Sequence, residues 1–149
     1  MIIVIGTDGS DDAIASARRG QELLAPGATI HLVCVAEPPV VATSGRESGV
    51  TGGVASANEI DAAWQAVTTE ADAVLVRTAD ALDGEVVARV VRGAPGAALC
   101  DLAAELAADA IVVGSRGLGA IRRALLGSVS TYVVNNAPCP VVVVRAGTD

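Results

Sequence analysis

Residues 111–130 read IVVGSRGLGAIRRALLGSVS, and we expect the rest of the chain to be organised around this stretch. Three β-branched residues open it as a buried strand, which Gly114 and Gly117 then end. Gly127 and Ser128 precede a second run with helical character. Ser128 is a favoured N-cap residue, and the first N–H groups of a helix are unpaired. The stretch therefore predicts an anion site, and phosphate is the anion that we expect there.

Two better-known phosphate motifs fit this stretch less well. A Walker A loop needs a lysine, and the chain contains none. A dinucleotide-binding turn has a similar pattern to Gly114, Gly117 and Gly119, with different spacing. That turn requires an acidic residue roughly 20 positions later, where this chain has Val134. A glycine-rich surface loop without a ligand is the remaining alternative.

Length and composition favour one domain over residues 1–149 with an aliphatic core. Apolar residues make up 52% of the chain, yet it has no Phe, one Trp and one Tyr. No apolar run approaches the ~20 residues of a membrane span, and the first residues show no basic segment of a signal peptide. We therefore expect a cytoplasmic protein with no membrane segment. The three cysteines have no metal-ligand spacing, so we expect reduced thiols.

Charge is unevenly distributed along the chain. The formal net charge is −7, but sixteen of the seventeen acids lie within residues 8–109. Residues 110–148 carry four arginines and no acid; these are Arg116, Arg122, Arg123 and Arg145. A local basic patch on an acidic protein suits a small anionic ligand, whereas a nucleic acid needs an extended basic face. Arg122 and Arg123 are equally well explained as a solvated surface.

Strand and helix patterns alternate along the chain. Apolar runs predict strands over residues 1–7, 29–36, 85–91, 110–114 and 141–145. Helices are predicted between them, the first after Ser10 with a stripe that includes Leu23, and the second after a capping box at Ser56 and Glu59. Such alternation predicts a doubly wound α/β domain with a five-stranded parallel sheet covered by helices on both faces.

Three other features of the chain carry separate expectations. Residues 37–55 lack periodicity, so they predict a long connection. His31 falls inside the second strand and has no second histidine to pair with, so we expect a structural role. Trp64 lies on the apolar stripe of the second helix, so we expect it in the core.

The spacing Gly114-x2-Gly117-x9-Gly127-Ser128 resembles the nucleotide-binding signature of the universal stress protein family, in its ATP-binding branch. The likeness extends over the whole chain, including Asp8 after the opening strand and Cys139-Pro140 before the last one. It implies a Rossmann-like sheet of order 3-2-1-4-5, ATP as ligand with Mg or Mn as the candidate cation, and a homodimer formed through the strand at residues 141–145. It also implies a nucleotide-dependent stress-response regulator with an unknown protein partner.

The resemblance assigns residues to the two ends of a nucleotide. At the adenosine end it implies Thr7, Asp8, Val35, Val113 and Gly114. At the phosphates it implies Arg116, Gly117, Gly127, Ser128, Val129 and Ser130. Asp8 could instead hold a divalent cation, or simply close the turn before the first helix.

Two rival functions stay open at this point. One is a slow ATPase or phosphotransferase, and the other is an interaction module of the same fold with an empty site. Asp8 is the only titratable group near the motif that could act as a base, which disfavours an enzyme. The intact glycine motif disfavours the empty site.

Overall fold

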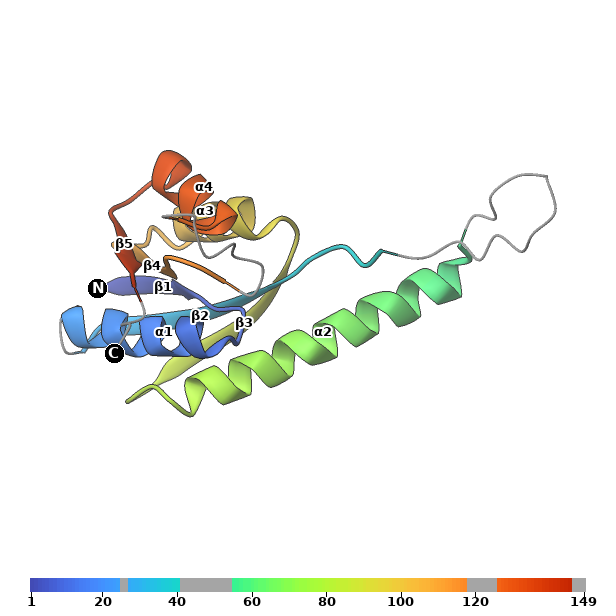
Figure 1. Ribbon diagram of the computed structural model, residues 1–149, viewed down its shortest axis with the longest axis horizontal. Coiled ribbons are helices and arrows are strands. Elements are labelled where there is room, and N and C mark those ends of the chain that lie inside the picture. The colour runs from blue at the N-terminus through green and yellow to red at the C-terminus, as the bar shows by residue number, and fades with distance from the viewer. Residues whose placement is uncertain (25–26, 41–54, 118–125, 146–149) are drawn as a thin grey trace.

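A computed structural model describes residues 1–24, 27–40, 55–117 and 126–145. Within them five strands and four helices alternate (Figure 1). In chain order they are β1 (Ile2–Gly6), α1 (Asp11–Leu23), β2 (Thr29–Ala36), α2 (Ala57–Ala79), β3 (Val86–Arg92), α3 (Pro95–Glu105), β4 (Ala110–Gly114), α4 (Ser128–Asn136) and β5 (Val141–Val144). Most of the predicted 37–55 connection, together with Gly119, Arg122 and Arg123, lies outside the described residues.

The five strands form one parallel sheet of order β3-β2-β1-β4-β5, which confirms the predicted fold. β1 lies at the centre and pairs with β2 on one side and with β4 on the other. The chain therefore builds one half of the sheet outward from β1 and then returns to build the other half. In open sheets of this kind, ligands bind beyond the carboxyl ends of the strands at the point where the order reverses.

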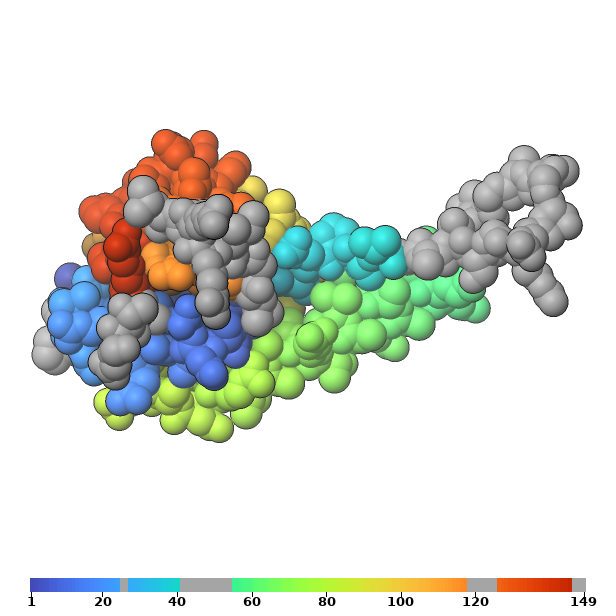
Figure 2. Space-filling view, viewed as in Figure 1, coloured from blue at the N-terminus to red at the C-terminus, as the bar shows by residue number. Residues whose placement is uncertain are grey.

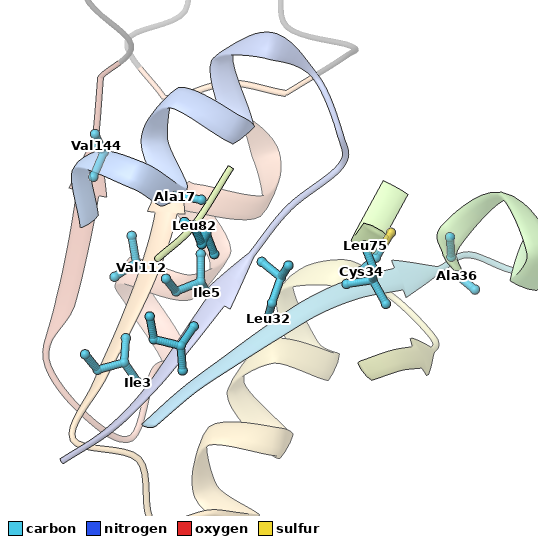
Figure 3. Close-up of a cluster of buried hydrophobic side chains, with 12 residues drawn as sticks. Ile3, Ile5, Ala17, Leu32, Cys34, Ala36, Leu75, Leu82, Val112 and Val144 are labelled. Atoms are coloured by element: carbon cyan, nitrogen blue, oxygen red, sulfur yellow. The ribbon is translucent and has the colours of Figure 1, made fainter. Parts of the chain in front are cut away.

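Alternate residues of each strand face opposite sides of the sheet and bury two apolar clusters. On one side Ile3 and Ile5 pack with residues of α1 and α2 (Figure 3). On the other side Val4 and Val33 pack with residues of α3 and α4. Both clusters are built almost wholly from aliphatic side chains, as the composition predicts. Gly20 brings α1 close to β4, because a Cβ there would collide with the Val112 side chain.

α2 is much longer than the other helices, with 23 residues, and it extends well past the sheet (Figures 1 and 2). It begins at the predicted capping box, in which Ser56 and Glu59 exchange hydrogen bonds. Residues 56–62 are all exposed. Trp64 is half-buried rather than fully internal, because it packs at the edge of the core with the Arg92 guanidinium 4.7 Å from its ring centre.

One packing prediction for the first helix is wrong. Leu23 was expected on the buried stripe of α1 but is 56% exposed. The helix instead buries Ala13, Ser16, Ala17 and Gly20. These small residues follow helical spacing and let the helix backbone approach the sheet closely, which leaves the larger Leu23 outside.

No helix in the described parts of the chain combines the length and the apolar character that crossing a membrane requires.

Candidate functional site

A cleft of about 520 Å³ opens beyond the carboxyl ends of β1, β2 and β4. All eleven residues that the sequence assigns to the two ends of a nucleotide line this one cleft. They come from β1 and its following turn (Thr7, Asp8), β2 (Val35), β4 and its following turn (Val113, Gly114, Arg116, Gly117), and the start of α4 (Gly127, Ser128, Val129, Ser130). The fold thus gathers four separate parts of the chain around one space large enough for a small ligand.

The Asp8 turn (residues 7–10) forms one border of the cleft. Its Asp8 carboxylate accepts hydrogen bonds from the Ser10 amide at 3.0 Å and from the Ser10 hydroxyl at 2.7 Å. Ser10 Oγ in turn accepts the Ala13 amide at 3.1 Å and caps α1. One oxygen of Asp8 therefore closes the turn before the first helix, which was one of the alternatives for this residue. Its other oxygen, Oδ2, lies beside Gly117.

Gly117 faces the Asp8 turn directly. A Cβ at residue 117 would meet Asp8 Oδ2 at a distance that real Cβ atoms do not adopt. Any side chain at this position must therefore displace the carboxylate or the loop. This close approach is a structural reason for glycine that is independent of any bound ligand.

The α4 start (residues 127–130) forms the opposite border. Gly127 is the N-cap, with φ −75° and ψ 170°, and Ser128 is the first helical residue. The prediction that Ser128 would be the N-cap is therefore wrong by one residue. The Gly127 amide donates to the Ser115 carbonyl at 2.7 Å, which brings the α4 start beside the end of β4.

The amides of the α4 start suit an anion. The hydrogen-bond ladder of α4 begins with the Thr131 amide, which donates to the Gly127 carbonyl at 3.0 Å. The amides of Ser128, Val129 and Ser130 precede this first bond and lie at the positive end of the helix dipole. The N-cap is Gly127 and not Ser128, but the segment still offers unpaired amides to an anion. This property depends on the end of the helix and not on which residue caps it.

A wall that the sequence analysis missed comes from α2. Val67, Glu70, Ala71 and Val74 line the cleft at spacings of three and four residues, so they share one face of the helix. The apolar members of this face were interpreted only as core. The one available signal was Glu70, a charged residue on a face that is otherwise apolar.

The floor of the cleft includes the Cys34 thiol. Burial, followed by the negative charges of Asp8, Glu70 and Asp72, raises the pKa of Cys34 to about 11. A thiol with this pKa is protonated at neutral pH and is a poor nucleophile. Within the described residues, the structure groups no three His, Cys, Asp or Glu side chains in a way that could hold a metal ion.

His31 plays no part in the cleft. Its side chain is 7% exposed, and burial, followed by the nearby charge of Arg89, lowers its pKa below the ordinary value of 6.5.

Taken together, the residues that line the cleft offer apolar walls for a flat group, amide donors for an anion, and the Asp8 carboxylate. Such an arrangement suits binding of a nucleotide, but it offers few groups that could activate water.

Known proteins resemble this chain over nearly its whole length. The family model described as the universal stress protein family matches residues 1–145. A universal stress protein of Thermus aquaticus is 37% identical over 147 residues, which cover 96% of this chain and 97% of that protein. The crystal structure of a universal stress protein in complex with cAMP is 31% identical, covers 97% of this chain and 96% of that one, and superposes with a TM-score of 0.61. The structure of the hypothetical protein MJ0577, at 21% identity and a TM-score of 0.74, covers 99% of this chain and 97% of that one and supports the fold alone.

Proposed function

This chain belongs to the universal stress protein family, and we propose that its cleft binds an adenine nucleotide, with ATP as the principal ligand. The observation that carries this proposal is the convergence of all eleven predicted residues on one cleft at the switch point of the sheet. A relative that is 31% identical over nearly the whole chain has been solved with cAMP, which supports an adenine nucleotide as the class of ligand.

We assign the two borders of the cleft to the two ends of the nucleotide. The phosphates lie against Gly117 and the amides of the α4 start, with Arg116 supplying positive charge. The adenosine lies between Val35 and Val113, with Asp8 beside it. If Mg or Mn accompanies ATP, Asp8 is the carboxylate that would hold the cation, whose charge would offset that of the phosphates.

We propose a nucleotide-dependent regulator of the stress response rather than an enzyme. Amide donors that bind a phosphate equally well before and during a reaction increase affinity without increasing rate. The ligand would act by favouring one conformation of the protein, which requires different affinities for two states. The partner that detects this change would be another protein.

Binding is tested first on purified protein. Mass spectrometry after mild denaturation should detect a co-purified adenine nucleotide, and calorimetric titration should give a saturable isotherm for ATP. Parallel titrations with ADP, AMP, cAMP and GTP rank the ligands. The proposal is wrong if no adenine nucleotide co-purifies and none binds in the titrations.

A phosphate-release assay separates the regulator from a slow ATPase. At saturating ATP with magnesium or manganese, we expect turnover far below the ~10 s⁻¹ typical of enzymes. Sustained release at several per second, abolished by Asp8→Ala, would make the protein an ATPase instead.

We further propose that the protein is a homodimer joined through β5. This edge strand is Val141–Val144, four valines preceded by Pro140, and the first three valines are only partly buried. An apolar edge of this kind favours pairing with a second strand. Val143→Asp places a charge in or beside that contact and should shift the mass measured by light scattering from dimer to monomer. Wild-type protein that is already monomeric at micromolar concentration would contradict this proposal.

A further inference from the structure

The Asp8 turn is held from outside by the last turns of α2. Thr78 is fully buried, and its hydroxyl lies 3.2 Å from the Thr7 hydroxyl. Thr78 Oγ1 donates to the Val74 carbonyl at 2.9 Å, and the Gly9 amide donates to Thr7 Oγ1 at 3.1 Å. A hydroxyl has one hydrogen to donate, so Thr7 must be the donor to Thr78. The bonds therefore run in one direction, from the Gly9 amide through both hydroxyls to the backbone of α2.

Arg77 holds the carbonyl of the same residue, Gly9. Its guanidinium donates to the Gly9 carbonyl at 2.8 Å. Gly9 has φ +74°, a conformation that other residues rarely adopt, and a Cβ at this position would collide with the Val74 side chain. The amide of Gly9 is thus tied to α2 through Thr7, and its carbonyl is tied to α2 through Arg77.

Neither Arg77 nor Thr78 lines the cleft, whereas Asp8 beside Gly9 does. We propose that Thr78 and Arg77 are positioning residues of the nucleotide site, which fix the backbone on both sides of Gly9 and so hold Asp8 in the orientation that faces Gly117. This inference rests on the proposed function of the cleft. It also assigns α2 two roles in the site. The helix lines the cleft through Val67, Glu70, Ala71 and Val74, and its last residues orient the Asp8 turn.

The expected effect follows from pre-organisation. A turn that is already ordered costs less free energy to use when a ligand binds, so releasing it lowers affinity without removing any ligand contact. Loss of one neutral hydrogen bond of this kind corresponds to roughly a threefold to tenfold loss in ATP affinity.

The test compares two threonines of the same helix. Thr78→Val removes the hydroxyl but keeps the shape of the side chain. Thr68→Val is the matched control, because Thr68 Oγ1 donates to the Trp64 carbonyl at 2.8 Å in the same way, and the described structure gives it no bond to the Asp8 turn. We expect Thr78→Val to weaken ATP binding roughly threefold to tenfold in calorimetric titration, while Thr68→Val and the rescue variant Thr78→Ser bind like the wild type.

The possible outcomes separate positioning from stability. A purely structural role would lower the melting temperature of Thr78→Val and leave the ATP affinity of the folded protein unchanged, which would overturn the inference. Equal weakening by Thr68→Val would also overturn it, because the effect would then belong to the helix in general.

A second variant keeps the inference testable if Thr78→Val does not fold. Arg77→Met removes the bond to the Gly9 carbonyl from the exposed side of α2. It should weaken ATP binding and speed amide hydrogen exchange in a peptide that covers residues 6–13. Unchanged affinity in a folded Arg77→Met protein would refute the inference alone, whereas a wild-type protein that binds no adenine nucleotide would end both proposals.

Discussion

The two borders of the cleft are held in different ways. The Asp8 turn depends on Arg77 and Thr78, which lie about seventy residues away in the sequence. The α4 start depends on Ser115, fifteen residues or fewer away, which accepts hydrogen bonds from the Gly127 amide and the Ser130 hydroxyl. The Asp8 turn is therefore held by a helix that is distant in the sequence. The α4 start is held by hydrogen bonds within the glycine motif to which it belongs.

This difference has a physical consequence. The α4 start keeps its geometry as long as β4 and α4 keep their own backbone bonds. The Asp8 turn has local bonds between Asp8 and Ser10, but it also uses bonds to Thr78 and Arg77, which exist only while α2 stays docked on the sheet. A change in the position of α2 can therefore alter one end of the proposed nucleotide site and leave the other end intact. A two-state regulator requires an element of this kind, whose movement changes only part of a binding site.

Gly117→Val gives the largest expected effect, because it acts where the two borders approach each other. The added side chain would meet Asp8 Oδ2, so it must displace the Asp8 carboxylate or the loop that carries residue 117. We expect at least a tenfold loss in ATP affinity, about 1.4 kcal/mol, measured by calorimetric titration.

The control for this variant is Ala62→Val, which also adds a valine but lies on the exposed part of α2, away from the cleft. Both variants should stay folded, because Gly117 lies at the surface. An ATP affinity within twofold of wild type in Gly117→Val would mean that residue 117 does not border the ligand.

Ser130→Ala tests the locally held border and should have a smaller effect. Ser130 is 2% exposed, and its one hydroxyl hydrogen is shared between the Gly127 carbonyl at 3.0 Å and the Ser115 carbonyl at 3.3 Å. Both carbonyls keep a backbone donor without it, the amides of Thr131 and Gly127 respectively. We therefore expect a stability loss of about 1 kcal/mol in urea unfolding and less than about a threefold change in ATP affinity.

The comparison between the two borders depends on this result. If Ser130→Ala weakens ATP binding more than Thr78→Val does, the α4 start is the more fragile border. The Ser130 hydroxyl would then be a ligand contact, although in the ligand-free protein it bonds to the backbone.

The strands and helices could be predicted from the sequence, because a parallel sheet and its helices leave strong periodic signals. The strand expected at residues 141–145 is Val141–Val144, and the one expected at 1–7 is Ile2–Gly6. The strand order and the eleven cleft residues were implied by the family resemblance. Each of these residues lies near the carboxyl end of a strand or inside the glycine motif, and the topology brings those ends together.

What could not be predicted depends on how helices rest on the sheet. The helical stripe of α2 does not reveal that residues 67–74 form a wall of the cleft, since the same pattern also describes a core helix. The bonds from Arg77 and Thr78 to the Asp8 turn depend on where α2 ends relative to β1. The prediction that Leu23 is buried was wrong because the close packing of Gly20 against β4 decides which face of α1 is buried.

The smallest effect is expected from His31, which lies near the start of β2 and away from both borders. Burial and the charge of Arg89 lower its pKa in the folded protein below 6.5, so the unfolded chain binds a proton more readily. The stability that depends on neutral His31 is complete above that value and is lost as the pH falls below it. Urea unfolding from about pH 7.5 to about pH 5.5 should therefore show a loss of stability that His31→Gln reduces. An identical loss of stability in the wild type and in His31→Gln would mean that other groups cause the acid sensitivity. A His31→Gln protein with altered ATP affinity at neutral pH would show that the two borders are not the only parts of the sheet coupled to the site.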